Sequence, residues 1–541
     1  MSAFGDFFKK ITGHEPYGHQ SDMAARLWNN GDGPGDQPLL LRAPTGSGKT
    51  EAIALPFLYQ WDEGKWPIAP RLIYVLPMRA LANQICDRIK KYADKVDKRI
   101  RVSVQHGERH DDAMLFSDIV VTTLDQAIYA YARSTTIHRH AEVPAGDLAN
   151  SLLVFDEAHM YSPYTYGMIH AFLEILRTAR VPFVFMTATM TDSLRNDFQQ
   201  GVLGRGFEFS GPRVQPPAIN RRITLETKGK PLLSEDGSLH PETFELIGNK
   251  KALVVLNQVG RAQEVYRQMR NKFGKDKIVL IHGRFTKEDR ARLEKEVEGR
   301  LGRNGSGGVV VATQVCEVGL DISADALLTE LAPADSIVQR AGRVARWGGE
   351  GEVYVFGVKE GIEKEDFWKS DEVEKEALPY EAKHIVETLK ALENKPDLAS
   401  WDDVQKFTKD LSYKVDHSAC SSAAWHLLED SILLATERPR PEDVAVREGK
   451  SITLVPVEVA EGDIDLDKKA IGVSFNLAYF HFKDDKGKLK KVMEPKEKKA
   501  KKGEEPKKVW ESRDAKASDF KPFDVVYIPG SLYSNEEGLL L

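Results

Sequence analysis

The feature that most constrains the fold of this chain is an apolar stretch that runs directly into the turn Ala43-Pro44-Thr45-Gly46-Ser47-Gly48-Lys49-Thr50. A strand, a glycine-rich loop and a helix in this order form a phosphate-binding loop, where Gly46 and Gly48 let backbone N–H groups approach phosphate oxygens. Lys49 adds positive charge at the β- and γ-phosphates, and the Thr50 hydroxyl can reach Mg²⁺. The turn therefore predicts an α/β protein that uses a nucleoside triphosphate.

A second motif, Asp156-Glu157-Ala158-His159, ends the apolar run Ser151–Phe155. Ligands of doubly wound sheets bind at the carboxyl ends of the strands, so both acids would emerge at such an edge. We expect Asp156 to hold Mg²⁺, often through water, and Glu157 to orient or deprotonate the attacking water. An isolated Asp-Glu pair is ordinarily a solvated loop, but Thr187-Ala188-Thr189 closes the next apolar strand in the order that motion-coupled hydrolysis needs.

Length and composition indicate a multi-domain protein with ordinary globular character. The 541 residues should form about three domains, and no run approaches the roughly 18 apolar residues of a membrane span. The first residues do not have the pattern of a secretion signal, so a cytoplasmic protein with no membrane contact is expected. Cys86, Cys316 and Cys420 are far apart, which argues against a disulfide framework or a zinc site.

The net charge of −6 contains a strong local asymmetry. Residues 483–508 carry twelve lysines and six acids, so this segment has a charge of +6 and the rest of the chain −12. A nucleic-acid track would therefore be local, in a cleft and not on a broad basic face. We expect the Lys-rich segment to be a mobile loop, with non-specific phosphate contacts and a purely solvated loop left as equal alternatives.

Apolar strands alternate with spacers of helical length along the first two thirds of the chain, which is typical of parallel sheets wrapped by helices. The expected strands are Pro38–Leu41, Leu72–Leu76, Ile119–Thr122, Leu152–Phe155 and Phe183–Thr187, then Ala252–Leu256, Ile278–Ile281, Val309–Thr313, Ala326–Leu331 and Val353–Phe356. The predicted fold class is thus α/β, with two tandem RecA-like parallel-sheet domains over residues 1–215 and 216–360. The Pro212–Pro217 stretch would join them.

The alternation stops after Gly357. Apolar spacing over Tyr380–Leu392 and a probable N-cap at Ser400 predict a helical connector over residues 361–430. A small mixed domain over residues 431–541 would contain strands at Ile452–Val459, Ile471–Phe482 and Val525–Ile528.

The series Gln339-Arg340-Ala341-Gly342-Arg343-Val344-Ala345-Arg346 places three arginines at three-residue spacing behind a glutamine. On a helix they would share one face, where Arg343 and Arg346 could stabilise charge on a γ-phosphate and Gln339 could lie near the attacking water. Surface ion pairs are the alternative. The preceding loop with Gly319 and Asp321 would form a switch between nucleotide and bound strand, reached across the cleft between the two domains.

These motifs in this order resemble the Asp-Glu-x-His group of superfamily 2 helicases over residues 17–356, including Ala43 where the general loop pattern has glycine. The resemblance implies ATP and Mg²⁺ as the nucleotide and metal, with Gln20 contacting adenine. The residues that it would place against the nucleic-acid backbone are Arg79, Gly107, Thr123, Asn257, Arg284 and Thr313.

Details of the motif sequences are similar to those of the helicase of type I CRISPR interference systems. These details are Met160-Tyr161 after the acidic motif, Thr313-Gln314 with Glu317 and Gly319-Leu320-Asp321, and the tail Tyr533–Leu539. Members of that family usually carry an N-terminal metal-dependent His-Asp nuclease. Too few residues precede Ala43 for such a domain, and His110-Asp111 lacks further ligands at suitable spacing. The resemblance therefore implies a stand-alone helicase subunit, with a separate His-Asp nuclease subunit and an RNA-guided CRISPR effector complex as partners.

The leading hypothesis is an ATP-dependent translocase that moves 3′ to 5′ on single-stranded DNA, with the direction implied by the family. An RNA-remodelling or DNA-repair helicase of the same superfamily would share the nucleotide chemistry and differ in its strand preference. A non-catalytic scaffold is the third alternative, and the intact set of motif residues argues against it.

Overall fold

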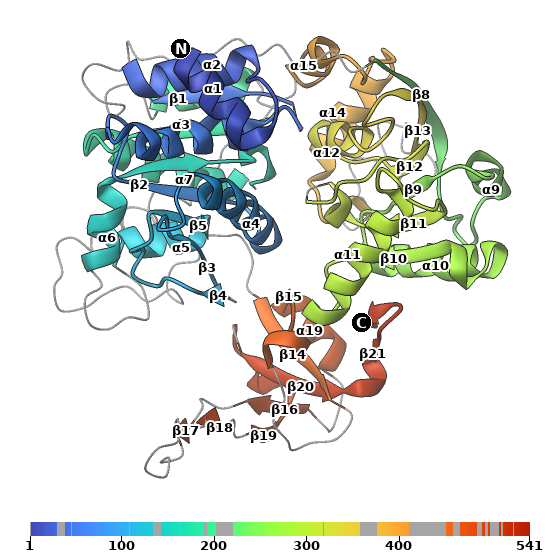
Figure 1. Cartoon of the computed structure of the whole chain (residues 1–541). Coiled ribbons are helices and arrows are strands. Elements are labelled where there is room, and N and C mark those ends of the chain that lie inside the picture. The colour runs from blue at the N-terminus through green and yellow to red at the C-terminus, as the bar shows by residue number, and fades with distance from the viewer. Residues whose placement is uncertain are drawn as a thin grey trace. The chain divides into compact units, whose positions relative to one another are not determined.

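The computed structural model of the chain describes residues 2–29, 38–44, 46–107, 109–133, 142–161, 163–188, 192–201, 220–317, 319–357, 376–409, 451–457, 466–483, 489–492, 496–497, 508–509, 512–522 and 524–541. The chain divides into two compact units, Met1–Ile219 with Ser400–Glu448 and Asn220–Ala399 with Gly449–Leu541 (Figure 1). Within the described residues, no helix combines the length and the apolar character that crossing a membrane requires.

The first unit is built on a seven-stranded sheet in the order β1-β7-β6-β2-β5-β3-β4. In that order the strands are Leu39–Arg42, Phe183–Thr187, Ser151–Phe155, Arg71–Leu76, Ile119–Thr123, Val102–His106 and Arg109–His110. All neighbours run parallel except β3 and β4, which are antiparallel. Strands β5, β6 and β7 are buried along their whole length because helices cover both faces of the sheet.

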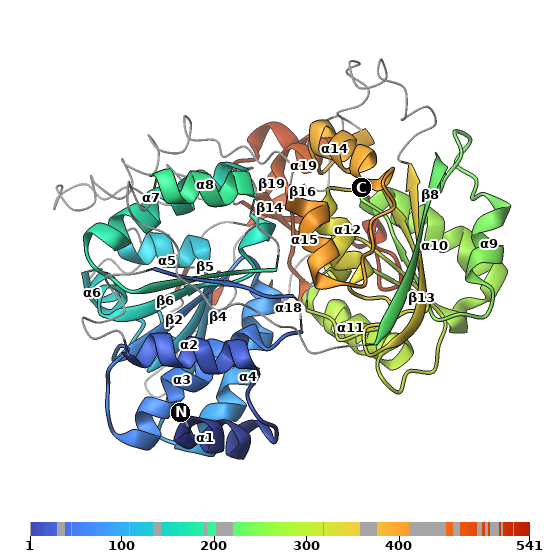
Figure 2. The same cartoon turned by 90° about the horizontal axis from the view of Figure 1, so that it is seen from above.

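The helices of this unit are α1 (Ser2–Thr12), α2 (Gly18–Asn29), α3 (Lys49–Glu63), α4 (Arg79–Val96), α5 (Leu124–Tyr131), α6 (Glu142–Ala149), α7 (Pro163–Thr178) and α8 (Asp192–Gly201). Figure 2 shows α2, α3 and α4 on one face of the sheet and α5, α7 and α8 on the other. The second face holds an apolar core that includes Phe155, Phe172, Phe185 and Phe198, all of them fully buried. The carboxyl ends of the central strands are thereby held in fixed register.

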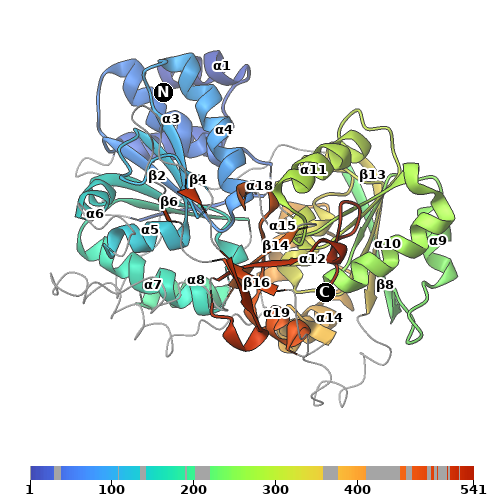
Figure 3. The ribbon, with the colours of Figure 1, turned by 90° about the horizontal axis from the view of Figure 1, so that it is seen from below.

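The second unit contains a six-stranded, all-parallel sheet in the order β10-β11-β9-β12-β13-β8. In that order the strands are Ile278–Ile281, Val309–Ala312, Ala252–Val255, Ala326–Glu330, Gly349–Gly357 and Arg221–Pro231. Its helices are α9 (Pro241–Ile247), α10 (Val259–Phe273), α11 (Lys287–Leu301), α12 (Ala334–Ala341) and α14 (Ala382–Leu392). Figure 3 shows α10 and α11 on one face of this sheet and α12 and α14 on the other.

The same unit carries a five-stranded mixed sheet in the order β15-β14-β20-β16-β19. In that order the strands are Ile471–Ser474, Ser451–Val457, Val525–Pro529, Leu489–Val492 and Ser512–Ala515. Helices α18 (Leu466–Lys469) and α19 (Phe475–Phe482) accompany it, and two small pairs are formed by β17 (Lys496–Glu497) with β18 (Lys508–Val509) and by β21 (Tyr533–Ser534) with β22 (Gly538–Leu539). Its core includes Leu454, Phe482, Val526 and Leu539.

The predicted fold class is confirmed, and every expected strand of the two parallel sheets is present within a few residues. The connector helix begins at Ala382, and Ser400 caps α15 (Trp401–Lys409), since the Asp403 N–H donates to its hydroxyl at 3.4 Å. Strands β3, β4 and β8 were not predicted, and β4 places the His110 backbone in a strand and not in a loop.

Two predictions for the C-terminal region are wrong. The expected strand Ile471–Phe482 ends at Ser474, and the rest of it forms the helix α19. The Lys-rich segment is not a loop throughout, because Leu489–Val492 forms a central part of the five-stranded sheet. Most other residues of that segment, and the predicted linker Pro212–Pro217, lie outside the described residues. The boundaries of the four predicted domains stay a proposal.

Candidate active site

The phosphate loop joins β1 to α3, and its backbone needs glycine. Gly46 and Gly48 have φ values of 83° and 78°, in the left-handed region, and Gly48 is the residue that immediately precedes α3. A Cβ atom on Gly48 would lie 2.3 Å from Nε2 of Gln20, so any other residue there would be strained by its φ and would also displace the Gln20 amide. The N-terminus of a long helix thus follows the loop, which favours an anion there. Thr45 lies outside the described residues.

Gln20 and His19 hold this loop from helix α2. The Gln20 Nε2 donates to the Gly48 carbonyl at 3.0 Å, and the Tyr17 N–H donates to the Gln20 Oε1 at 2.9 Å. The His19 Nε2 lies 3.0 Å from the Ser47 carbonyl, and burial lowers the pKa of His19, so the ring is neutral and donates. Gln20 is therefore beside the nucleotide loop, while its contact with adenine stays a prediction.

Lys49, Asp156 and Glu157 come together at the carboxyl ends of the strands. The Lys49 Nζ is buried and lies 3.3 Å from both the Glu157 Oε1 and the Ala43 carbonyl. Glu157 has a φ of 51°, a conformation that is uncommon outside glycine and that clusters at active sites. The structure thus places the expected water-activating acid against the expected phosphate-binding lysine.

Tyr74 is the residue of this site that the sequence analysis missed. Its hydroxyl donates to the Asp156 Oδ2 at 2.7 Å and also hydrogen-bonds Thr50. Burial, and next the Glu157 charge, raise the pKa of Asp156 to about 6, whereas Lys49 and the Tyr74 hydrogen bond oppose that rise. The available signal was a tyrosine within the otherwise aliphatic strand Arg71–Leu76.

The donor set at Tyr74 fits Mg²⁺. The Tyr74 hydroxyl hydrogen-bonds both Thr50 and Asp156, so these two side chains, each with an oxygen that could bind the metal, lie near each other at the phosphate loop. Mg²⁺ commonly takes one or two carboxylates and completes its shell with phosphate oxygens and waters. In the part of the chain that is described, no three His, Cys, Asp or Glu side chains form a cluster suited to a metal ion.

Three residues of this unit are expected at the nucleic acid. Arg79 and Gly107 lie together, and Thr123 is buried. Arg79 is the first residue of α4, and its guanidinium is 3.0 Å from the position of a Cβ on Gly107. Gly107 therefore gives room to the arginine head group. Thr123 is buried immediately before α5, and its contact with a nucleic-acid backbone stays a prediction.

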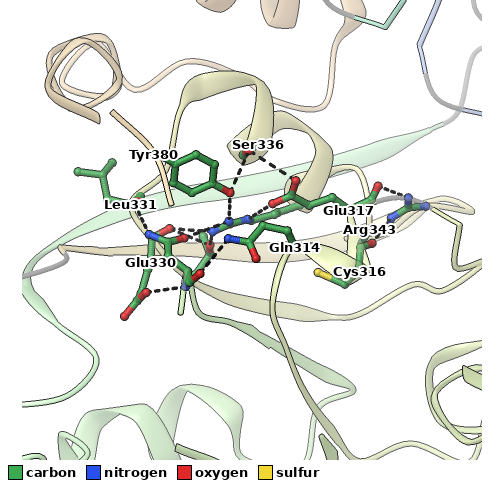
Figure 4. Close-up of polar contacts among 11 residues, drawn as sticks. Gln314, Cys316, Glu317, Glu330, Leu331, Ser336, Arg343 and Tyr380 are labelled. Carbon is green, nitrogen blue, oxygen red and sulfur yellow. Dashed lines mark hydrogen bonds and ion pairs between the residues drawn. The ribbon is translucent and has the colours of Figure 1, made fainter. Parts of the chain in front are cut away.

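In the second unit, Arg340 is the centre of a buried polar network, and its partners Glu317, Glu330 and Tyr380 are labelled in Figure 4. Its five N–H groups donate to Glu317 Oε1 (2.8 Å), Thr329 Oγ1 (2.7 Å), the Glu330 carbonyl (3.1 Å), Asn257 Oδ1 (3.1 Å) and the Tyr380 hydroxyl (3.0 Å). A guanidinium has five donors, so every one is used. Tyr380 comes from the connector, which the motif analysis did not include.

The arginines of this motif do not share one helix face, contrary to the prediction, because α12 ends at Ala341. Arg343 is no surface ion-pair residue either. It is buried and donates to the carbonyls of Cys316 (3.0 Å), Leu320 (3.0 Å) and Glu317. Arg343 therefore shapes the loop that carries Gly319, whose φ is 89°, and Asp321.

Arg346 has a different environment from Arg343. Its Nε lies 3.3 Å from the Asp321 Oδ1, and the Asp321 side chain is 72% exposed. Gln339 is buried, and its Oε1 has no hydrogen-bond partner among the described residues. The catalytic roles of Gln339, Arg343 and Arg346 stay predictions.

Asn257 and Thr313 are both buried, and their contact with a nucleic-acid backbone stays a prediction. The Asn257 amide donates to the Leu331 carbonyl at 2.9 Å and accepts from Arg340, which uses its polar atoms inside the unit. Arg284 is half-buried in the loop between β10 and α11, and burial alone lowers the pKa of its guanidinium. Arg284 is the one of these three residues that is not fully buried, and its contact with a phosphate stays a prediction as well.

Comparison with known proteins agrees with these motifs. Residues 20–197 match the DEAD/DEAH box helicase family, and residues 248–348 match the family described as CRISPR-associated nuclease/helicase Cas3, C-terminal. A CRISPR-associated helicase Cas3 of Thermoproteus tenax is 31% identical over 456 residues, which cover 79% of this chain and 73% of the relative.

Other relatives are longer than this chain. A putative CRISPR-associated nuclease/helicase Cas3 of Methanocaldococcus jannaschii is 29% identical over 62% of the chain, and the match spans 47% of that relative. The crystal structure of T. fusca Cas3-ADP superposes with a TM-score of 0.65 at 20% identity, over 86% of this chain and 65% of that one, which shows a shared fold. Together with the T. tenax relative, these findings show that the chain belongs to the CRISPR-associated helicase Cas3 family and is an ATP-binding helicase of the DEAD/DEAH-box class.

Proposed function

We propose that the chain is an ATP-dependent translocase that moves 3′ to 5′ along single-stranded DNA in CRISPR interference. The observation that carries the proposal is the phosphate-loop site, where Lys49 lies 3.3 Å from Glu157 beside the Asp156–Tyr74 pair. The direction of movement and the preference for DNA rest on the family resemblance. A cytoplasmic location stays a prediction of the same kind.

The residues of the first unit have distinct tasks in this proposal. Thr50 and Asp156 would hold Mg²⁺, which when bound neutralises charge on the β- and γ-phosphates. Lys49 would exchange its contact with Glu157 for the phosphates, so the Glu157 carboxylate becomes available to orient or deprotonate a water. Tyr74 keeps Asp156 aimed at the metal position.

The residues of the second unit would act on the same nucleotide. We propose that Arg343 and Arg346 stabilise charge that develops on the γ-phosphate and that Gln339 lies near the water. Gly319 and Asp321 would couple that contact to the bound strand. Hydrolysis would then require the two units to close and reopen in each cycle.

The test is ATP hydrolysis by the purified chain in the presence of single-stranded DNA or single-stranded RNA of equal length. Strong stimulation by DNA and weak stimulation by RNA are expected. Glu157→Gln is the matched control, since it should bind ATP and DNA without turnover. Stimulation by RNA alone would favour the RNA-remodelling alternative, and no stimulated turnover would overturn the proposal.

The proposed partners are a separate His-Asp nuclease subunit and an RNA-guided effector complex. A chain of similar fold, with a TM-score of 0.56 at 21% identity, occurs in a CRISPR RNA-guided surveillance complex in a pre-nicking state. We expect the purified chain with Mg²⁺, Mn²⁺ or Ni²⁺ to leave circular single-stranded DNA intact. Cleavage that follows the chain through purification would contradict the separate nuclease.

A further inference from the structure

The C-terminal segment Tyr533–Leu541, here called the tail, packs against the face of the six-stranded sheet that carries α10 and α11. Figure 3 shows this end of the chain, in dark red, beside both helices. Leu539 is fully buried, and the antiparallel pair of β21 and β22 gives the tail its own hairpin.

Buried polar contacts anchor the tail to α10. The Gln263 amide donates to the carbonyls of Glu537 at 2.7 Å and Leu539 at 3.1 Å. Gln263 is only 4% exposed, so without the tail its buried N–H groups would lose their acceptors. Ion pairs reinforce the anchor, from Arg267 to Glu537 at 2.6 Å and from Arg270 to Glu536 at 2.9 Å.

The tail also holds the loop His282–Thr286 between β10 and α11. The His282 Nε2 donates to the Glu537 carbonyl at 2.9 Å, and its Nδ1 accepts the Arg284 N–H at 3.1 Å. The Leu539 N–H donates to the Arg284 carbonyl at 2.9 Å. At the far end of the loop, the Tyr533 hydroxyl accepts the Thr286 N–H at 3.1 Å. The backbone on both sides of Arg284 is therefore fixed by the tail.

Arg284 differs from the arginines around it. Arg290 pairs with Glu294 at 2.9 Å and Arg292 with Asp289 at 3.0 Å. Among the described residues, none forms an ion pair with the Arg284 guanidinium, and burial is the one cause that lowers its pKa. A half-buried guanidinium with this much unused donor capacity suits a phosphate.

We propose that the tail is a brace that positions Arg284 for contact with a phosphate of single-stranded DNA. The inference rests on the proposed function and adds a positioning role for residues far from the helicase motifs. Gly538 is the point where the brace is most easily disturbed. Its φ is 73°, and a Cβ there would lie 2.6 Å from the His282 ring and 2.7 Å from the Arg284 carbonyl.

The test compares Gly538→Ala with Gly299→Ala in the full chain. Gly299 lies exposed on α11 and has nothing within 4 Å of an added Cβ, so it controls for the substitution itself. Binding of a fluorescent oligothymidylate is measured over a series of salt concentrations. One lost phosphate contact should lower the salt slope of log K by about 0.7, so we expect that change in Gly538→Ala and none in Gly299→Ala.

Three further variants separate positioning from folding. Arg284→Ala should reproduce the Gly538→Ala slope, and the double variant should be no weaker than either single one. A general loss of folded protein would lower the binding amplitude and leave the slope unchanged. Tyr533→Phe removes only the hydroxyl. If Gly538→Ala does not fold, the salt slope of Tyr533→Phe is measured in its place.

A wild-type slope in folded Gly538→Ala or, where that variant does not fold, in Tyr533→Phe would overturn the brace, as would additive effects in the double variant. These outcomes leave the proposed function standing, provided that the wild-type chain binds the oligonucleotide. A wild-type chain without affinity for single-stranded DNA would overturn the proposed function together with the brace.

Discussion

At the scale of single residues, the active site depends on one hydroxyl and one ammonium. Tyr74 hydrogen-bonds Asp156 and Thr50, and Lys49 is held between a carbonyl and the Glu157 carboxylate. These contacts preorganise the acids before any nucleotide arrives. The roles of Lys49 and Glu157 can therefore be separated by substitution.

Lys49→Ala should abolish ATP hydrolysis, because the phosphates lose their main counter-charge and Glu157 loses its partner. Glu157→Gln should bind ATP with near wild-type affinity and fail to turn it over, since the amide cannot accept a proton. Nucleotide binding and steady-state turnover, measured side by side, check both results. Wild-type turnover in either variant would contradict the site assignment.

His282 gives a prediction for the dependence of stability on pH. Burial lowers its pKa to about 3, and its two nitrogens are occupied by the Glu537 carbonyl and the Arg284 N–H. Below pH 6.5 the unfolded chain gains a proton that the folded chain does not bind. The contribution of neutral His282 to the free energy of unfolding is thus fully present above pH 6.5. It falls by about 1.4 kcal/mol per pH unit as the pH decreases toward 3.

The measurement is urea unfolding of the second unit at pH 7 and pH 5, compared between wild type and His282→Gln. Wild type should lose about 2 kcal/mol more than the variant over this interval, because glutamine does not titrate. Equal losses in the two proteins would show that His282 becomes protonated without cost.

At the scale of elements, the arginine motif spans the end of α12 and the turn after it, so its arginines have separate tasks. Arg343 holds the carbonyls of Cys316, Glu317 and Leu320, whereas Arg346 forms an ion pair with the exposed Asp321. Substituting Arg343 should therefore disturb the loop that contains Gly319 as well as any transition-state contact.

Arg346→Ala should slow DNA-stimulated hydrolysis by about 10³-fold or more while the stability of its unit changes little. Arg343→Ala should slow hydrolysis and also lower that stability, because three carbonyls lose their donor. Turnover and urea unfolding of both variants check the difference. If both keep most of the stimulated rate, the two-unit mechanism is wrong.

At the scale of the whole molecule, the described residues form two units with separate cores. A defect buried in one core should therefore lower the stability of that unit alone. The Arg340 network lies wholly in the second unit, and its contacts connect α12, three segments of the parallel sheet region and the connector residue Tyr380.

Arg340→Lys should destabilise the second unit by about 3 kcal/mol or more, since an ammonium has three donors in place of five planar ones and leaves buried acceptors of the network unpaired. Hydrogen exchange resolved by segment should show faster exchange in β9, β11 and β12 and unchanged exchange in β2, β5 and β6. Equal acceleration in both units would show that they unfold together.

Several elements were not predicted correctly from the sequence, for physical reasons. Strand β8 alternates between partly buried and exposed residues and is rich in Arg and Lys, so it lacks the apolar run of a central strand. The run Ile471–Phe482 is mostly apolar, and short apolar runs do not distinguish a strand from a helix. Only packing against the five-stranded sheet decided where the strand ended.

The sequence by itself determined the nucleotide chemistry and the fold class. The phosphate loop and the acidic motif are each an uninterrupted stretch of sequence. Their residues act through local backbone geometry at the ends of strands that the apolar pattern also predicts. Only the tertiary structure decided that Asn257, Thr313 and Thr123 are buried, that Arg343 shapes a loop, and that the tail holds the Arg284 loop. Those outcomes depend on hydrogen-bond partners that lie far away in the chain, and no local pattern specifies which distant carbonyl or carboxylate a side chain will meet.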